Sequence, residues 1–365
     1  MNIRDLLRLS SVPRIGPLKI RALLTAFDTP DGVLRATPRD LIRVPGIDKK
    51  LASAIAHHDG DRYADHQIRL VRRIGGNILA YWDDRYPDLL KKIYDPPPLI
   101  FVLGDLKPAD RLSMGVVGTR QPSRYGVSIA ELLSVELSKL GIVIVSGLAR
   151  GIDTVAHTSA LKAGGRTIAV IGSGLDVPYP PENRGLMETI TGQGAVISEF
   201  PMGASPDPSN FPRRNRLISG LTLGIVVVES DVDGGAMITA STALDQNREV
   251  FAIPGMVTEK RSQGPHKLIR EGRAKLVHSI EDILDELQPF TRLRTGTPKS
   301  EPLPELTLFE RRIHDILLPD PVHIDVVSEQ SGLSVPDTLV TLLALEFKGL
   351  VKQLPGKFFQ KAGMY

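Results

Sequence analysis

Short apolar runs alternate with helix-period stretches through the middle of the chain. Unbroken apolar runs predict buried strands at 114–117, 142–145, 167–171, 195–198, 223–228 and 249–253. Stretches with the 3.6-residue period of amphipathic helices lie between them, at 125–140, 153–163, 181–191, 212–220 and 236–247. Strands without alternation, separated by helices, are typical of a parallel sheet that is covered on both faces. The pattern therefore predicts an α/β protein with a Rossmann-like, doubly wound, mostly parallel sheet.

The N-terminal part, residues 1–75, has a different pattern of short helices. Helix-period stretches lie at 4–9, 18–24, 38–41 and 49–58. Two similar glycine turns, V-P-R-I-G and V-P-G-I, each stand before a basic helix start. Such turns resemble helix-hairpin-helix (SAM-like) modules, in which backbone N–H groups can point at a phosphate. A helical bundle that binds no ligand is the other interpretation that this pattern allows.

The C-terminal part, residues 309–365, predicts a winged helix. Three helices are expected at 309–317, 324–331 and 335–349, followed by two strands at 351–354 and 357–360. The third helix offers only Lys348 as a base-reading side chain, which favours a packing or protein-contact role. A proline-rich connector at 76–112 and a polar linker at 289–308 then bound the Rossmann-like domain at 113–288. Within the connector, 99–103 predicts a strand at a sheet edge.

Composition and charge narrow the expected class of protein. The 365 residues include no cysteine, which excludes disulfides and thiolate sites. The sequence shows neither a signal peptide nor a membrane-length apolar run, so we expect a soluble cytoplasmic protein. Residues 1–80 hold 14 Lys and Arg against 8 Asp and Glu. This basic surplus is typical of a phosphate-backbone binder, although a solubilising surface would look the same.

Glycine turns follow five of the predicted strands, and three of these turns add arginine. In parallel sheets such loops gather at the carboxyl edge, where ligands bind. We therefore predict a cationic cradle for single-stranded nucleic acid, since arginine planes and aromatic rings also stack bases. Tyr179 and Phe211 are the aromatic candidates, with a core position favoured for Phe211. The candidate nucleic-acid-binding residues are Gly118, Thr119, Arg120, Ser123, Ser146, Gly147, Arg150, Gly151, Gly172, Ser173, Arg213, Arg214, Asn215, Arg216, Gly234 and Gly235.

Several motifs that are typical of catalysis or cofactor binding are incomplete or absent in the sequence. The G-S-G-L-D-V segment at 172–177 has valine at the third glycine position of a dinucleotide fingerprint, which argues against NAD or FAD. The sequence contains no P-loop, no G-x-S-x-G elbow and no metal-ligand spacing among its eight histidines. We expect no cofactor, no metal and no catalytic residue. His157 is expected to be a packed or capping histidine, and Asp153 is expected to be a helix N-cap.

The strand-end motifs resemble those of the DNA-processing protein A (DprA/Smf) family. The matching motifs include G-T-R-x-x-S-x-Y-G at 118–126, V-S-G-L-A-x-G-I-D-x-x-A-H at 145–157, G-x-G-x-D-x-x-Y-P at 172–180 and F-P-x-R-N-R-x-I-S-G-L at 211–221. The resemblance implies a homodimer that binds single-stranded DNA through the Rossmann-like domain without catalytic turnover. It implies that the protein protects incoming DNA and helps to load RecA recombinase in natural transformation, displacing single-strand-binding protein. By motif position, Arg120 should contact phosphate, and Arg213, Arg214 and Arg216 should line the same pocket.

Two departures from known patterns bear on this interpretation. Family members often carry a lysine after the Y-P pair, where this chain has Pro181 and Glu182; Arg184 is a candidate substitute. The alternative function is that of a nucleotide phosphoribohydrolase of the LOG-like superfamily, with the motif P-G-G-x-G-T-x-x-E. Ser241 stands here in place of the glutamate that assists glycosidic cleavage, which disfavours the enzyme.

Overall fold

The computed structural model describes residues 2–291, 306–317, 321–348, 350–354 and 356–361. The chain forms two compact units, Met1–Thr291 and Arg292–Tyr365. The limits predicted above for the modules within these units stay predictions. Most of the predicted linker, residues 292–305, lies outside the described residues. Within the described ranges, no helix is both long and apolar enough to span a bilayer.

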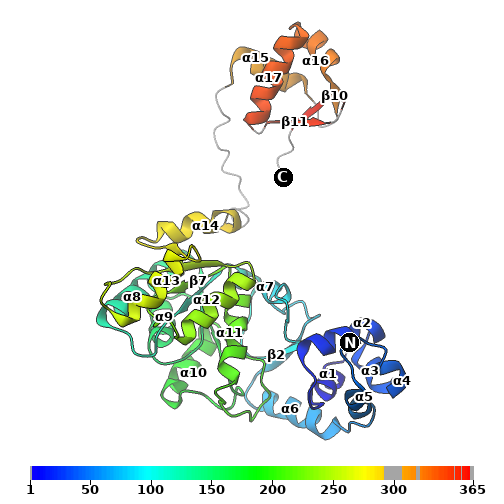
Figure 1. Cartoon of the computed structure of the whole chain (residues 1–365), viewed down its shortest axis with the longest axis vertical. Coiled ribbons are helices and arrows are strands. Elements are labelled where there is room, and N and C mark those ends of the chain that lie inside the picture. Colours follow the sequence, from blue (N-terminus) through cyan, green and yellow to red (C-terminus); the bar gives the residue numbers. More distant parts are fainter. Residues whose placement is uncertain (1, 292–305, 318–320, 349, 355, 362–365) are drawn as a thin grey trace. The chain divides into compact units, whose positions relative to one another are not determined.

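A nine-stranded sheet runs through the larger unit in the order β1-β2-β6-β5-β4-β3-β7-β8-β9. Figure 1 labels β2 and β7 of this sheet. The strands are β1 (Asn77–Ala80), β2 (Leu99–Gly104), β3 (Ser113–Val117), β4 (Val143–Ser146), β5 (Thr167–Val170), β6 (Ala195–Ser198), β7 (Gly224–Val227), β8 (Glu249–Ala252) and β9 (Lys275–Leu276). The strands from β6 to β9 in this order are parallel, whereas β2 runs antiparallel to both of its neighbours, β1 and β6. The strands that follow β3 are added first on one side of it, beginning with β4, and later on its other side, beginning with β7. This reversal is the switch point at which doubly wound sheets bind ligands.

Helices cover both faces of the sheet, as the unbroken apolar strands predict. One face is covered by α7 (Asp88–Lys91), α11 (Asn210–Gly220), α12 (Gly235–Asp245) and α13 (Gln263–Arg270). The other face is covered by α8 (Arg124–Lys139), α9 (Ile152–Lys162), α10 (Arg184–Gln193) and α14 (Glu281–Thr291). The central strand β4 contributes to both faces: Val143 and Val145 join one buried cluster, and Ile144 joins another. The predicted doubly wound fold is confirmed.

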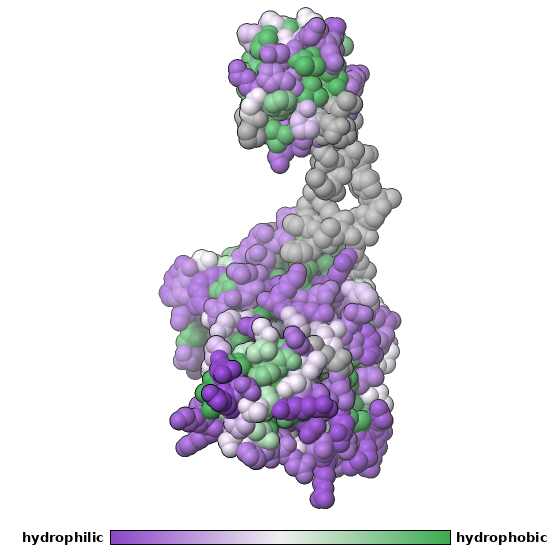
Figure 2. Space-filling view, turned by 90° about the vertical axis from the view of Figure 1, so that its right-hand side faces the viewer, coloured by the Kyte–Doolittle hydropathy of each residue, from purple (hydrophilic) through white to green (hydrophobic). Residues whose placement is uncertain are grey.

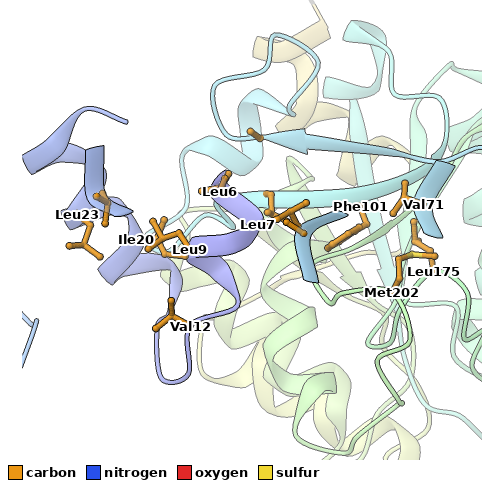
Figure 3. Close-up of a cluster of buried hydrophobic side chains, with 14 of the residues drawn as sticks. Leu6, Leu7, Leu9, Val12, Ile20, Leu23, Val71, Phe101, Leu175 and Met202 are labelled. Carbon is orange, nitrogen blue, oxygen red and sulfur yellow. The ribbon is translucent and has the colours of Figure 1, made fainter. Parts of the chain in front are cut away.

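A helical module precedes the sheet. It consists of α1 (Ile3–Ser10), α2 (Pro17–Phe27), α3 (Pro30–Arg35), α4 (Pro38–Leu41), α5 (Lys49–Ala56) and α6 (Asp61–Arg73). Its core is continuous with that of the sheet: Figure 3 shows Leu7 of α1 beside Phe101 of β2, with Leu175 and Met202 beyond. The buried Gln67 side chain of α6 also accepts from the Met202 N–H at 2.8 Å and donates to its carbonyl at 3.3 Å. The module is therefore fixed to the sheet.

The outer surface of this module is mostly hydrophilic. Figure 2 views the larger unit from the side of the helical module, and hydrophilic residues there surround a paler, partly hydrophobic area. Several apolar side chains of the module, including Leu6, Leu9 and Leu23, are fully buried. Burial of these residues stabilises the shared core of the module and the sheet by roughly 1.5–3 kcal/mol for each side chain.

The sheet differs from the prediction at one edge. The segment at 99–103 was predicted to be an edge strand, and this is wrong, because β1 pairs along its outer side with Ala80 opposite Leu99. The strand β1 has only four residues, and the apolar run 78–82 that overlaps it does not by itself reveal the pairing with β2. The helices α3 and α6 were also not predicted individually. The connector thus completes the sheet instead of merely leading into it.

The smaller unit is a winged helix. Its elements are α15 (Leu308–Ile316), β10 (Val322–His323), α16 (Ile324–Ser331), α17 (Val335–Phe347), β11 (Val351–Leu354) and β12 (Phe358–Lys361). The three strands pair in the order β10-β12-β11. Ile313, Val327, Leu342 and Phe359 lie in one buried cluster. The predicted helices and hairpin are confirmed, with the short β10 added.

Candidate nucleic-acid interface

A cavity of about 380 Å³ opens at the switch point, above the carboxyl ends of β3, β4 and β7. We call it the switch-point cavity. Three segments form its walls: the loop after β3, the α11 helix, and the loop that leads into α12. Seven predicted residues lie in its lining, namely Gly118, Thr119, Arg120, Arg214, Asn215, Gly234 and Gly235. A shallow neighbouring cavity is lined in part by Gly147, Arg150, Gly172, Tyr179 and Phe211.

Arg214 forms the buried floor of the switch-point cavity. The residue is 4% exposed, and its Nη1 donates to the Val170 carbonyl at 2.9 Å. Among the described residues, its Nε has no hydrogen-bond partner. Burial, together with the charge of Arg120, lowers the pKa of Arg214 to about 10, so it remains cationic at neutral pH. A buried cation whose hydrogen-bonding capacity is incompletely used favours an anionic ligand.

Asp153 is a buried carboxylate whose charge acts on Arg214. It is not the N-cap of α9, as the sequence suggested, because Gly151 holds that position. Instead its Oδ2 accepts from the N–H groups of Gly147 at 3.1 Å and Ala149 at 3.3 Å, which fixes the turn after β4. Burial raises the pKa of Asp153, and the Arg214 charge opposes that rise. The carboxylate therefore organises the loop while it partly balances the buried cation.

Two glycines allow the loops to pack this closely. A Cβ on Gly147 would lie 1.7 Å from Nη1 of Arg214, so a side chain there would displace the guanidinium. Gly151 has φ +76°, and a Cβ there would lie 2.3 Å from the Thr119 carbonyl oxygen. These positions explain two of the glycines in the motif after β4: they are packing positions beneath the cavity, and neither has to touch a ligand.

Phe211 joins the two cavities through aromatic and cationic contacts. The guanidinium carbon of Arg120 lies 5.4 Å from the Phe211 ring centroid, and that of Arg214 lies 5.8 Å away. The Tyr179 ring centroid lies 5.7 Å from that of Phe211, at 49°. The core position favoured for Phe211 is wrong, because the ring is only partly buried and belongs to none of the apolar clusters. Its partly exposed ring and the exposed Arg120 can stack a base.

The first turn of α12 adds backbone donors to the switch-point cavity. Gly234 is the N-cap and Gly235 the first residue of this 11-residue helix. No atom lies within 4 Å of where a Gly235 Cβ would be, so the cavity reaches the helix start. The unpaired N–H groups and the helix dipole there favour an anion, and they act together with Arg214.

Arg216 was predicted to line the same pocket as Arg213 and Arg214, and this is wrong. It forms ion pairs with Glu199 and Asp95, and its Nη1 donates to the Asp95 carbonyl at 2.6 Å. Residues two apart on a helix differ by about 200° in direction, so Arg216 points away from Arg214. Arg213 is exposed outside the switch-point cavity, with its guanidinium carbon 5.2 Å from the Phe200 ring centroid.

Three predicted serines use their hydroxyls within the fold, and none of them lines either cavity. Ser123 is the N-cap of α8 and donates to the buried carboxylate of Glu229. Ser146 donates to the Val116 carbonyl at 2.6 Å, and Ser173 donates to the Val177 carbonyl at 2.7 Å. Their roles in the structure are therefore caps and turn anchors.

Arg150 has an acidic partner that the sequence did not indicate. It forms an ion pair with Glu182, and each side chain is 51% exposed. Glu182 follows the Y-P pair at 179–180, in the short segment where the family resemblance implies a lysine. This chain thus loses one cation and has another partly neutralised at the rim, while Arg184 is exposed at the start of α10. The cationic character of the site depends mainly on Arg120 and Arg214.

Residues that the sequence analysis missed also line the switch-point cavity. They are Gln121, Ala149, Ile218, Ser230, Asp231 and Thr239, with Val117 and Ala236 beneath them. Ser230 and Asp231 follow β7 directly, so the strand-end rule could have found them. Asp231 forms an ion pair with Lys260 at 2.8 Å. Phe200, which supports Arg213, follows β6 and could have been found in the same way.

His157 is packed inside the fold, apart from both cavities. It is fully buried, and its Nδ1 lies 2.6 Å from the Thr167 hydroxyl. Burial lowers the pKa of His157 from 6.5 to about 3. As the pH falls below 6.5, His157 becomes protonated in the unfolded chain but stays neutral in the folded protein. The free energy of unfolding therefore decreases progressively towards pH 3.

We expect this histidine to contribute about 1.4 kcal/mol of destabilisation for each pH unit in the middle of that range. Thermal melts of the wild type and of His157→Gln across that range measure the contribution as a difference in slope. The variant should show the flatter dependence on pH. Parallel slopes would mean that His157 is protonated in the folded protein.

Comparison with known proteins places this site in a family. A model described as DNA recombination-mediator protein A matches residues 77–288, a DprA winged-helix model matches 297–357, and a SAM-like helix-hairpin-helix tandem matches 6–56. Protein Smf of Synechocystis is 33% identical, with 96% of this chain and 97% of that protein aligned. DprA of Bacillus subtilis is 44% identical over 60% of this chain and 74% of its own length.

Two solved structures of DprA proteins are similar in fold to this chain. DprA from Streptococcus pneumoniae superposes with a TM-score of 0.70 at 36% identity, covering 78% of this chain and 98% of that one. DprA from Helicobacter pylori, whose structure concerns a single-stranded DNA binding mode, gives a TM-score of 0.54 at 30% identity, over 59% of this chain and 96% of that one. The chain belongs to the DNA-processing protein A (DprA/Smf) family.

Proposed function

We propose that the protein binds single-stranded DNA in the switch-point cavity and holds a phosphate above Arg214. The observation that carries this proposal is a buried guanidinium with an unused Nε in the floor of an open cavity. Arg120 and the first turn of α12 supply further positive potential around the same space. Phe211 and Tyr179 beside it offer flat faces to unpaired bases.

Stacking on these rings distinguishes a single strand from a duplex. In a duplex the base faces are hidden by their neighbours, so Phe211 and Arg120 could contact only the backbone. The relative from Helicobacter pylori, whose structure concerns binding of single-stranded DNA, supports the same ligand. By family membership we extend the proposal to a homodimer that protects incoming DNA and loads RecA recombinase in place of single-strand-binding protein.

A titration of labelled single- and double-stranded oligonucleotides at two salt concentrations tests this function. We expect single strands to bind more tightly at both concentrations, with affinity that falls as salt rises. Fluorescence anisotropy measures both dependences. Equal affinity for the two forms would contradict a site that reads unpaired bases.

The winged helix should contribute little to this binding. Its α17 helix presents apolar side chains to solvent, including Val335, Leu339 and Val340, and carries acidic rather than basic residues in its body. A helix of this composition lacks the side chains that read base edges. Removing residues 300–365 should therefore change single-strand affinity by less than about threefold in a gel-shift titration, since few phosphate contacts would be lost. A loss far beyond that range would assign DNA contacts to this unit.

We also propose that the site has no hydrolase activity on nucleotides. The carboxylates that line the switch-point cavity are Asp153, which holds the turn after β4, and Asp231, which pairs with Lys260. Ser241, at the position of the phosphoribohydrolase glutamate, accepts from Arg273 at 3.2 Å. Incubation with nucleoside monophosphates should release no free base by chromatography. Base release that disappears in an Asp153→Asn variant would establish the enzyme instead.

A further inference from the structure

A second cavity, of about 330 Å³, lies between the helical module and the sheet. We call it the Trp82 cavity. Its apolar lining comes from Ile20, Leu24, Tyr81, Trp82, Pro96 and Pro98. Tyr81 is 38% exposed and Trp82 is half-buried, so aromatic surface faces the opening. Arg21 and Asp28 of the α2 segment provide its charged groups.

The Trp82 cavity lies at the same edge of the sheet as the switch-point cavity. Because β1 and β2 run antiparallel, the end of β1 and the start of β2 lie beside the end of β6: Ala80 pairs with Leu99, and Phe101 pairs with Ser198. The end of β1 is two strands from β6 and five from β3. At about 4.8 Å per strand these steps correspond to roughly 10 Å and 24 Å.

Two exposed arginines, each beside an aromatic ring, lie along the edge between the two cavities. Phe211 and Arg120 stand at the switch point, and Arg213 covers Phe200 just after β6. The Trp82 cavity follows two strands further on. A single strand with its phosphates near these arginines would carry its bases from Phe211 towards the Trp82 cavity.

The walls of the Trp82 cavity are anchored to the helix that carries the switch-point arginines. Arg216 of α11 donates to the Asp95 carbonyl and pairs with its carboxylate. The buried Tyr86 hydroxyl donates to the Pro97 carbonyl at 2.8 Å. On the opposite wall, Ile20 belongs to the core shared by the module and the sheet. The cavity is thus preformed, and the third arginine of the R-R-N-R segment has a role in positioning its wall.

We propose that the Trp82 cavity takes an unpaired base of the same DNA strand that the switch-point cavity holds by a phosphate. This inference rests on the proposed function. Indole, phenol and proline faces suit a flat, partly apolar base, and the exposed Arg21 suits the adjoining phosphate. Arg21 already donates to the Tyr94 carbonyl at 3.2 Å, which keeps the guanidinium at the rim. Asp28 repels phosphate, so the backbone passes on the Arg21 side.

Trp82 is the only tryptophan of the chain, so its fluorescence reports on this cavity alone. The full-length protein is titrated with end-labelled oligonucleotides from about 4 to about 16 nucleotides, a span typical of single-strand sites. Label anisotropy measures binding, and tryptophan emission measures occupancy of the cavity. The shortest oligonucleotides should raise anisotropy without quenching Trp82, and longer ones should do both. Long oligonucleotides whose far half lacks bases should bind without quenching.

The two readouts separate this inference from the proposed function. Binding of long oligonucleotides without quenching overturns the base site and leaves the switch-point site standing. It would favour a polypeptide as the occupant of the cavity. No rise in anisotropy at any length overturns the proposed function, and this inference with it.

Variants provide a second test that does not depend on emission. Arg21→Ala should weaken binding of the longest oligonucleotides by roughly tenfold and leave the shortest unchanged, because only long strands reach the cavity. Arg35→Ala is the matched control, since Arg35 is 80% exposed on the same module and lies outside the cavity lining. Trp82→Leu should behave like Arg21→Ala, and Trp82→Phe should restore most of the affinity. Equal affinity for all lengths in Arg21→Ala and wild type would overturn the inference.

Discussion

Replacing Arg120 with alanine should weaken binding of single-stranded DNA by about tenfold and reduce the slope of log affinity against log salt by about one. The exposed guanidinium of Arg120 lies above the Phe211 ring and beside the switch-point cavity, where it can contact a phosphate and a base. Loss of one phosphate contact removes about one released counterion, which sets the change in slope. Anisotropy titrations at several salt concentrations measure both quantities.

Arg124 supplies the matched control for this experiment. It is an exposed arginine of the same segment, at the first position of α8, and it lies outside the cavity lining. Arg124→Ala should leave the affinity within about twofold of wild type, as expected for a charge at a distance from the ligand. Equal losses in the two variants would show that the net charge of the surface, and not the cavity, binds the DNA.

Replacing Gly151 with alanine should lower the free energy of unfolding by about 2–4 kcal/mol and reduce DNA affinity as well. The residue has φ +76° and ψ −128°, a conformation that is essentially limited to glycine. The new Cβ would lie 2.3 Å from the Thr119 carbonyl oxygen, which accepts from the Ile152 N–H at 3.2 Å. The loops after β3 and β4 would have to separate, and Arg120 would move with them.

Gly164→Ala separates backbone strain from this collision. Gly164 has φ +72°, and nothing lies within 4 Å of its Cβ position, so the substitution should cost only about 1 kcal/mol. Denaturant unfolding followed by circular dichroism compares the two variants. A Gly151→Ala protein that is as stable as Gly164→Ala would show that the two loops are not held together at this point.

Much of the fold follows from the sequence because buried parallel strands leave unbroken apolar runs. The runs around Val145 and Val226 are bounded by glycine turns, and both became central strands. The strand β1 was not predicted, although an apolar run at 78–82 overlaps it. Its existence depends on pairing with β2, which is a tertiary contact that local patterns do not encode.

The site was predictable as a set of loops but not as a set of side-chain directions. The strand-end rule placed Arg120 and Gly235 at one cavity, because the carboxyl ends of parallel strands meet there. It could not separate Arg214, which lies in the floor, from Arg216, which the helix turns towards Glu199. That separation required the helix phase relative to the sheet. The acidic partner of Arg150 came from a different loop, and adjacency in sequence gives no sign of it.

Photo-crosslinking of a single strand that carries iodinated uracil tests the central claim most directly, because such bases react with aromatic side chains that they contact. The account predicts that peptide mapping of the crosslinked full-length protein recovers Phe211 or Tyr179, and that Arg120→Ala lowers the yield. Crosslinks confined to the winged helix, or distributed evenly over exposed aromatic residues such as Tyr94, would contradict it.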